Sequence, residues 1–342
     1  MAEACLALAM IGLTAYAVLG GADLGAGFWD LTAGGAHRGG RVRGLIQRSM
    51  SPVWEANHVW LIFVAIALFS GFPEAFAALS RSLTGPLSIA LLGIVLRGAA
   101  FAFRQYGAPY GGRPVRGTAM WARVFAVSSL ITPFAFGAAA GGITTGQLRK
   151  DGSAGLIEPF VAPLPLLSGL LAVAACGFLA AVYMTADADR EGDADLVTRL
   201  RRRALITGVI AGGLAIAALP LLPDWFAERL SIPVVAVSVV CGALALELVR
   251  RGHYHLARVA AAGAPAALLG GWALAMHPWV LPGDVPLRVG SEPTAALILG
   301  ILICGLLIVL PSYWYMIRVL RAPQAAQSSA PSEKAASRSC LE

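Results

Sequence analysis

The chain has 342 residues, of which 58% are hydrophobic and 13% are charged, and its formal net charge is +7. Soluble domains carry about 25% charged residues, so this composition excludes an ordinary soluble protein and indicates a chain whose surface lies largely in lipid. The basic residues do not cluster with aromatic residues in a polar segment, so we expect no nucleic-acid partner. In membrane proteins an excess of Lys and Arg is typical of the loops that set orientation.

Apolar runs of about 20 residues, the length that a membrane-spanning helix needs, recur along the chain. They predict an all-α polytopic membrane protein with nine transmembrane helices. The expected spans are 5–22, 53–79, 84–104, 119–142, 161–184, 203–222, 232–250, 257–277 and 295–320. The N-terminal run lacks a basic n-region and a small-residue cleavage site, so we count it as the first helix rather than as a signal peptide.

These spans are expected to form a single transmembrane domain over residues 1–321. Helices 1–4 occupy about 5–142, helices 5–8 about 161–277, and helix 9 about 295–320. The segment 322–342 is rich in Ala, Ser, Pro and Gln. Such a composition buries too little apolar surface to fold, so we predict a disordered cytoplasmic tail.

Basic residues alternate between successive loops. The loops after the odd-numbered helices, together with the tail, hold 20 of the 26 Lys and Arg residues, and the loops after the even-numbered helices hold five. Because cytoplasmic loops carry the excess of Lys and Arg, the N-terminus is predicted outside and the C-terminus in the cytoplasm. A wrong number of helices would scramble this alternation, so the charge pattern supports nine.

The cysteine and histidine pattern does not indicate a metal site. The five cysteines are isolated from one another, with no C-x-x-C or Cys/His spacing. His58 lies in a predicted span, but a haem held by two histidines would need a matching residue deep in a facing helix, and the sequence offers none. We therefore expect this chain to bind neither a metal nor a cofactor, with a single haem ligand at His58 as the alternative.

Polar residues gather at the predicted cytoplasmic side of the first helices. Ionisable groups inside a membrane cost about 2.5–3.5 kcal/mol each, so they are candidate functional residues by default. Asp23 lies near the inner end of the first span, in the glycine-rich stretch GGADLGAGFWDL (20–31). Glu55, Asn57 and His58 lie in the first two turns of the second span. Glu55 and His58 are three residues apart and therefore share a helix face.

Two arginines and a further acid complete this group of candidates. Arg97 lies about two turns before the cytoplasmic end of the third span, and Arg104 lies at that end. Either arginine is a candidate counter-ion for Asp23 or Glu55, and the sequence does not decide between them. Glu74, in the outer half of the second span, has an interfacial position as its alternative. Glu55 also has a purely structural alternative role, because an acid in the first turn of a helix interacts favourably with the helix dipole.

Three segments, taken together and in their order along the chain, resemble subunit II of cytochrome bd-type quinol oxidases, the cytochrome d ubiquinol oxidase subunit II family. The segments are GGADLGAGFWDL (20–31), SPVWEANHVWLIFVAIALFSGFPEAFAALS (51–80) and LLGIVLRGAAFAFR (91–104). The resemblance is strong over about residues 10–105. Beyond that region, only the helix spacing and the closing PSYWYMIRVLR (311–321) agree.

The resemblance implies a fold of two four-helix bundles plus one peripheral helix, in the inner or plasma membrane of a prokaryote. It implies a heterodimer with a haem-bearing subunit I, which holds the b-type and d-type haems, oxidises quinol and reduces oxygen to water. Subunit II holds no haem ligand, supports assembly of this electrogenic enzyme and contributes to proton uptake from the cytoplasm. The chain alone is expected to be inactive, and a small accessory subunit and membrane lipid are further expected partners.

The resemblance also assigns roles to the candidate residues. No catalytic residue is expected in this chain. The predicted proton path comprises Asp23, Glu55, Asn57 and His58, and the predicted supporting charges are Arg97, Arg104 and Glu74. Two positions depart from the family pattern. Gly20 stands where some members have an additional Asp, and Glu55 stands where Asp is common, which keeps the charge but lengthens the side chain.

Two other functions remain open at this point. A secondary transporter with an intramembrane acidic and arginine site would also have many helices with buried charges, although transporters usually show broken helices at matching positions of both halves. The other alternative is a purely structural subunit, in which Arg97 neutralises Asp23 without any role in proton movement.

Overall fold

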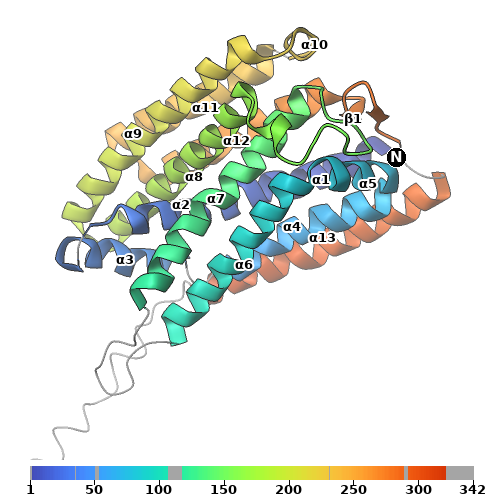
Figure 1. Ribbon diagram of the computed structural model, residues 1–342. Coiled ribbons are helices and arrows are strands. Elements are labelled where there is room, and N and C mark those ends of the chain that lie inside the picture. The colour runs from blue at the N-terminus through green and yellow to red at the C-terminus, as the bar shows by residue number, and fades with distance from the viewer. Residues whose placement is uncertain are drawn as a thin grey trace, which may run out of the picture. The chain divides into compact units, whose positions relative to one another are not determined.

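The computed structural model describes residues 2–34, 36–50, 54–106, 118–230, 232–288 and 292–320. Helices account for almost all of this part of the chain (Figure 1). The chain separates into two compact units, Met1–Leu302 and Ile303–Glu342. The predicted tail, 322–342, lies outside the described residues.

Within the described residues, eight helical segments are long and apolar enough to cross a membrane. The sequence predicts nine spans, and the difference from the structure lies at the second one, 53–79. This span is divided into two helices, α4 (Trp54–Gly71) and α5 (Pro73–Ser82). Pro73 has no N–H to continue the first helix, but suits the first position of the next one. Between the two helices, Phe72 is fully buried. The apolar part of α4, Glu55–Gly71, is thus shorter than the other spans.

The first predicted span, 5–22, is too short, because one continuous helical segment of 30 residues covers Ala2–Leu31. It consists of α1 (Ala2–Ala15), a π-helical segment (Tyr16–Gly20) and α2 (Gly21–Leu31). Asp23 is therefore not at the end of this helix. It lies eight residues before Leu31, about 12 Å at 1.5 Å per residue.

The remaining long helices agree with the predicted spans, except that the sixth begins at residue 194 rather than 203 and the fifth ends at residue 190 rather than 184. They are α6 (Thr84–Tyr106), α7 (Thr118–Thr144), α8 (Pro163–Arg190), α9 (Ala194–Ala218), α11 (Ile232–Arg251), α12 (Tyr254–Met276) and α13 (Glu292–Leu320). Asp193 explains the early start of α9, since its carboxylate accepts a hydrogen bond from the N–H of Leu196 (3.0 Å) as a helix N-cap.

Short elements lie at the helix ends. The helix α3 (Ala36–Met50) follows α2 and is amphipathic, with Val42, Leu45 and Ile46 buried and Arg41 and Arg48 exposed. At the other ends of the helices lie α10 (Asp224–Ala227) and a two-stranded antiparallel hairpin, β1 (Trp279–Leu281) and β2 (Val285–Pro286). Two single 3₁₀ turns, Glu158–Phe160 and Leu219–Leu221, complete the described elements.

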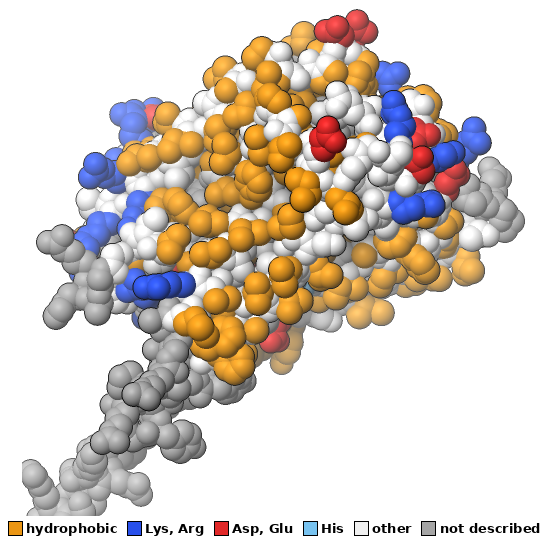
Figure 2. Space-filling model, viewed as in Figure 1, with side chains coloured by type: hydrophobic (Ala, Val, Ile, Leu, Met, Phe, Trp, Pro, Cys, Tyr) orange, Lys and Arg blue, Asp and Glu red, His pale blue; other side chains and the backbone are white. Residues whose placement is uncertain are grey.

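The interior is built from small and aliphatic side chains shared between several helices. One buried cluster joins α2 and α3 to α8, α9, α11 and α12, and a second joins α1, α4 and α5 to the first residues of α13. Large apolar side chains also face outward along the helices, for example Leu92, Val95, Leu170, Val209 and Ile216. Figure 2 shows this apolar surface between two charged ends, as expected for helices in lipid.

Candidate functional site

A buried ion pair joins α2 to α6. Nη1 of Arg97 lies 2.7 Å from Oδ2 of Asp23, and Nη2 lies 2.9 Å from Oδ1, so the guanidinium binds both carboxylate oxygens. Nη2 also donates to the backbone carbonyl of Asp23 (3.0 Å), and Nε donates to Oγ of Ser129 on α7 (2.9 Å). Each charged side chain is only 4% exposed. Among the pairings that the sequence left open, the structure brings Arg97 to Asp23.

The helices can approach this pair closely because α2 is rich in glycine. A Cβ at Gly25 would lie 1.9 Å from the backbone oxygen of Cys176 on α8, and a Cβ at Gly27 would lie 2.2 Å from Oγ of Ser129. Both separations are far below contact distance, so neither position has room for a side chain. The glycines thus allow α2 to pack closely against α7 and α8 beside the Asp23 carboxylate.

The aromatic ring of Phe125 covers the guanidinium from α7. Its centroid lies 4.7 Å from Cζ of Arg97, a distance suited to a cation–π interaction. Arg97 is therefore surrounded by a carboxylate, a backbone carbonyl, a hydroxyl and an aromatic face. Because four hydrogen bonds from Arg97 are made within the chain, the desolvation of this charge is compensated locally.

The π-helical segment connects this region to α4. Asn57 is fully buried, and its Nδ2 donates to the carbonyl of Leu19 (3.2 Å), which lies in the π-helical segment. The His58 ring meets the ring of Tyr16 edge to face, with 6.1 Å between the centroids. Tyr16 also packs against Phe136 of α7 (5.9 Å). Two neighbouring residues of α4 therefore contact the turn that precedes Asp23.

Two other predicted residues, Glu55 and Glu74, are exposed and do not join the buried ion pair. Glu55 is exposed in the first turn of α4, on the same helix face as Val59 and Ile62, which are also exposed. Glu74 is exposed in the first turn of α5. Arg104 belongs to α6, but its side chain lies outside the described residues, so its predicted role as a supporting charge stays a prediction.

The sequence analysis missed a second buried acid, Asp30, seven residues after Asp23 in the same glycine-rich segment. Its side chain is 4% exposed, and its Oδ1 lies 2.9 Å from Nε of Arg43 on α3. Nη2 of Arg43 also donates to the carbonyl of Gly34 (2.7 Å). A spacing of seven residues places both acids on one helix face, and this signal could have identified Asp30.

Exposed ion pairs attach α3 to the connection between α8 and α9. Arg48 binds Glu191 through two nitrogens, at 2.7 and 3.2 Å, and Arg41 contacts Asp193 and Asp195. The hydrogen bond from Arg41, together with the one from the Leu196 N–H, lowers the pKa of Asp193 below its ordinary value. The same bond raises the pKa of Arg41. These contacts hold the amphipathic helix against the transmembrane helices.

The second half of the chain also has a largely buried ion pair, near the end of α8. Asp187 pairs with Arg258 of α12, and the guanidinium of Arg258 lies over the ring of Tyr183, 5.3 Å from its centroid. Both charged side chains are mostly buried, at 19% and 15% exposure. The acid lies in the segment AAVYMTADAD (180–189), whose sequence faintly echoes the end of the first helix.

The described residues do not fit a haem held by two histidines. His58 faces Tyr16, while His253, His255 and His277 are exposed at helix ends. A search of the described part of the chain also finds no group of three or more His, Cys, Asp or Glu residues that could hold a metal ion.

Known proteins resemble this chain over long segments. It is 28% identical over 219 residues to cytochrome bd ubiquinol oxidase subunit 2 of Bacillus subtilis (strain 168), covering 61% of each chain. It is 29% identical over 136 residues to cytochrome bd-I ubiquinol oxidase subunit 2 of Escherichia coli (strain K12), covering 39% of this chain and 33% of that protein. The matches thus span less than two thirds of these relatives.

The fold also matches a solved structure of bd oxidase from Geobacillus thermodenitrificans, with a TM-score of 0.73 over 94% of this chain and 98% of that one, at 22% identity. The family model of cytochrome bd terminal oxidase subunit II matches residues 1–320. The buried charges, the helical membrane fold and a match over nearly the whole chain lead to one assignment. This chain belongs to the cytochrome bd terminal oxidase subunit II family.

Proposed function

We propose that this chain is the haem-free subunit II of a quinol:oxygen oxidoreductase and works only in a complex with a haem-bearing subunit I. The observation behind this proposal is the family match over residues 1–320. Since the histidines that the structure describes do not form a facing pair, we assign the haems and the oxidation of quinol to the partner. The match gives no support to the secondary transporter that the sequence left open.

The proposed contribution of this chain to turnover is proton uptake from the cytoplasm, beginning at Glu55. A proton entering a low-dielectric region needs groups that can take it up, release it or orient water. Glu55 is exposed, and His58 lies on the same helix face, where side chains three residues apart have Cβ atoms about 5–6 Å from each other. Tyr16 then contacts His58 and extends this series of groups to the π-helical segment.

Within this proposal, Asp23 and Asn57 position the path rather than carry protons. Without the negative charge of Asp23, the two hydrogen bonds from Arg97 would lose their charge assistance and Arg97 would be buried without its counter-ion. Asn57 cannot titrate, and its bond to Leu19 fixes α4 against the π-helical segment. The structural role for the Arg97–Asp23 pair and the proton role for the Glu55 region are therefore compatible.

The proposal includes the arrangement and orientation of the helices. We propose two groups of four helices plus α13, supported by the buried cluster that α8, α9, α11 and α12 share. We place α3 and the arginine-rich loops in the cytoplasm of a prokaryotic cell, and the N-terminus outside, from the distribution of Lys and Arg. A small accessory subunit stays a prediction from the resemblance.

The test is to purify the complex with its co-expressed neighbour subunit, and to measure quinol-dependent oxygen consumption and proton uptake from the cytoplasmic side. We expect Glu55→Gln to assemble normally and to slow proton uptake about tenfold or more, a barrier increase of 1.4 kcal/mol or more. Asp195→Asn, an exposed acid on the same side, is the matched control and should keep full rates.

Two results would contradict the proposal. If the complex contains no haem and does not oxidise quinol, the assignment to an oxidase is wrong. If Glu55→Gln and His58→Phe both assemble and keep the proton uptake rate of the unchanged complex, the chain has no proton role and is a structural subunit.

A further inference from the structure

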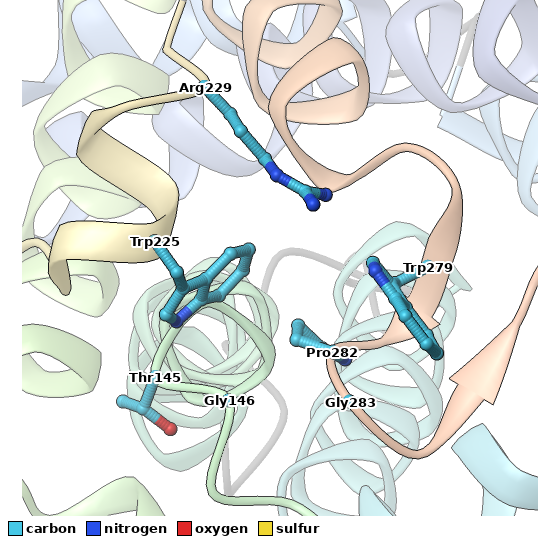
Figure 3. Close-up of a pocket in the computed structure, with 7 residues that line it drawn as sticks. All are labelled: Thr145, Gly146, Trp225, Arg229, Trp279, Pro282 and Gly283. Carbon is cyan, nitrogen blue, oxygen red and sulfur yellow. The ribbon is translucent and has the colours of Figure 1, made fainter.

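A pocket of about 330 Å³ lies at the helix ends opposite to α3, away from the Arg97–Asp23 pair and from Glu55. The end of α7, the short helix α10 and the β1–β2 hairpin surround it (Figure 3). Its lining residues are Thr145, Gly146, Trp225, Arg229, Trp279, Pro282 and Gly283. Small-molecule sites in proteins begin at about this volume, commonly with apolar walls and a few polar groups.

The walls and the donors of this pocket come from different elements. Figure 3 shows the indoles of Trp225 and Trp279 on opposite sides, with Arg229 pointing into the space beside Trp279. Nη1 of Arg229 donates to the carbonyl of His277 (3.1 Å), which fixes the guanidinium at the mouth. Its other N–H groups and the Trp279 indole N–H remain as donors for a ligand.

Glycine keeps the floor of the pocket open. Gly146 and Gly283 have φ values of 72° and 75°, a region that strongly favours glycine. A Cβ at Gly146 would lie 3.2 Å from Nε1 of Trp225, so a side chain there would press against the indole wall. Both turns therefore leave space between the two indoles.

The charged group that lines the pocket, Arg229, favours an anion. Besides Arg229, Arg149 lies at the rim, where its Nη1 donates to the carbonyl of Gly146 (3.2 Å). The nearest acid on the hairpin, Asp284, is turned to the N–H of Lys150 (2.7 Å). Asp224 on α10 and Glu228, the residue after this helix, are exposed. The inward-pointing group is thus a guanidinium, which binds phosphate oxygens in a fork geometry.

We propose that this pocket binds the phosphodiester headgroup of a membrane phospholipid, with phosphate on Arg229 and Trp279 and the glycerol between the indoles. The position at the helix ends is that of lipid headgroups, where tryptophan rings are commonly found. Apolar side chains for the acyl chains flank α10 in the sequence, with Leu219 at 49%, Leu221 at 38% and Ile232 at 82% exposure. A free phosphate ester would share the headgroup chemistry but gain nothing from these apolar residues.

The test is native mass spectrometry of the delipidated oxidase complex during titration with phosphatidylglycerol. One lipid should stay bound at collision energies that strip the others. Arg229→Gln should weaken this binding about tenfold, because two or more charge-assisted hydrogen bonds are lost, and Trp279→Leu should weaken it as well. Arg288→Gln removes an exposed charge from the same side outside the pocket and is the matched control.

Two ligands, one without the phosphate and one without the acyl chains, distinguish a lipid site from a site for free phosphate esters. Dioleoylglycerol, which has no phosphate, should not occupy the site, and glycerol phosphate should not displace the lipid at equal concentration. The proposal is overturned if Arg229→Gln retains the lipid like Arg288→Gln, if dioleoylglycerol binds equally well, or if glycerol phosphate displaces the lipid. Binding is the readout, so the outcome is independent of whether Glu55 takes up protons.

Discussion

Arg97 and Asp23, which are 74 residues apart in the sequence, form a bidentate ion pair with N–O distances of 2.7 and 2.9 Å. The pair connects α6 to α2, the last part of the first helical segment, and both side chains are almost fully buried. In such a place the desolvation of two charges can exceed their attraction, so the pair is not in itself evidence of stabilisation. Its effect is best seen when one partner is removed.

We expect Arg97→Met to lower the free energy of unfolding of the complex by about 3–5 kcal/mol, because Asp23 would be left as an isolated buried charge. The loss can be measured by SDS titration of the complex in mixed micelles. The double variant Asp23→Leu/Arg97→Met should recover most of the loss, since both charges are then absent. If the Arg97→Met complex is as stable as the unchanged complex, water reaches Asp23 and the prediction is wrong.

Gly25→Ala is expected to lower assembly and stability strongly. The new methyl group would lie 1.9 Å from the backbone oxygen of Cys176, and a backbone atom cannot move aside as a flexible side chain can. Overpacking of interiors typically costs about 1–3 kcal/mol, and a backbone clash belongs at the upper end. The same SDS titration measures the effect.

Gly212→Ala is the matched control for Gly25→Ala, because nothing lies within 4 Å of a Cβ at that position of α9. We expect this variant to be tolerated or to be slightly more stable, since alanine favours helix by about 1 kcal/mol over glycine. Equal losses for both variants would show that glycine is needed in these helices for reasons other than close packing.

The sequence analysis located most helices because lipid exposure leaves a simple signal. A run of about 20 apolar residues identifies a span wherever the helix is continuous. The signal failed at Pro73, where the apolar run continues although the backbone begins a new helix. It also failed after Asp23, because a polar residue ends an apolar run but not a helix whose surroundings pair the charge.

The candidate site was only partly predictable. Asp23 and Arg97 were identified because charges in apolar runs are rare, but their pairing depends on how α2 and α6 pack, which no local pattern specifies. Tyr16 and Ser129 escaped notice, since neither residue type is unusual in a membrane helix. The pocket around Trp225 and Trp279 joins elements that are separated by more than 50 residues, so composition and spacing could not predict it.

Asn57→Leu is expected to destabilise the contact between α4 and the π-helical segment. The carbonyl of Leu19 would lose its hydrogen bond from Nδ2 in a buried position, and an unsatisfied buried polar group costs about 1–3 kcal/mol. The loss should appear as faster amide hydrogen exchange in residues 16–20 and 55–60, measured by mass spectrometry. Unchanged exchange in both segments would mean that Asn57 does not fix this contact.

The contacts of Arg41 and Leu196 lower the pKa of Asp193, so the attachment of α3 should depend on acid. A group whose folded-state pKa lies below its unfolded value, about 3.9 for Asp, adds stability above that value and loses it as pH falls through the folded-state pKa. The attachment of α3 should therefore weaken below about pH 4. Amide hydrogen exchange of residues 41–49, corrected for the intrinsic effect of pH and followed from pH 6 to pH 3, measures this change.

Asp193→Asn separates charge from helix capping, because asparagine can still accept the hydrogen bond from Leu196. We expect this variant to open α3 more readily at neutral pH and to lose the Asp193 part of the response to acid. Because Arg41 is half exposed, high salt should reduce the difference between the variant and the unchanged chain. Asp195→Asn, at a longer distance from Arg41 (3.3 Å), should retain most of the response. An identical pH response in Asp193→Asn and the unchanged protein would contradict the assignment, because it would mean that this pair does not hold α3 in place.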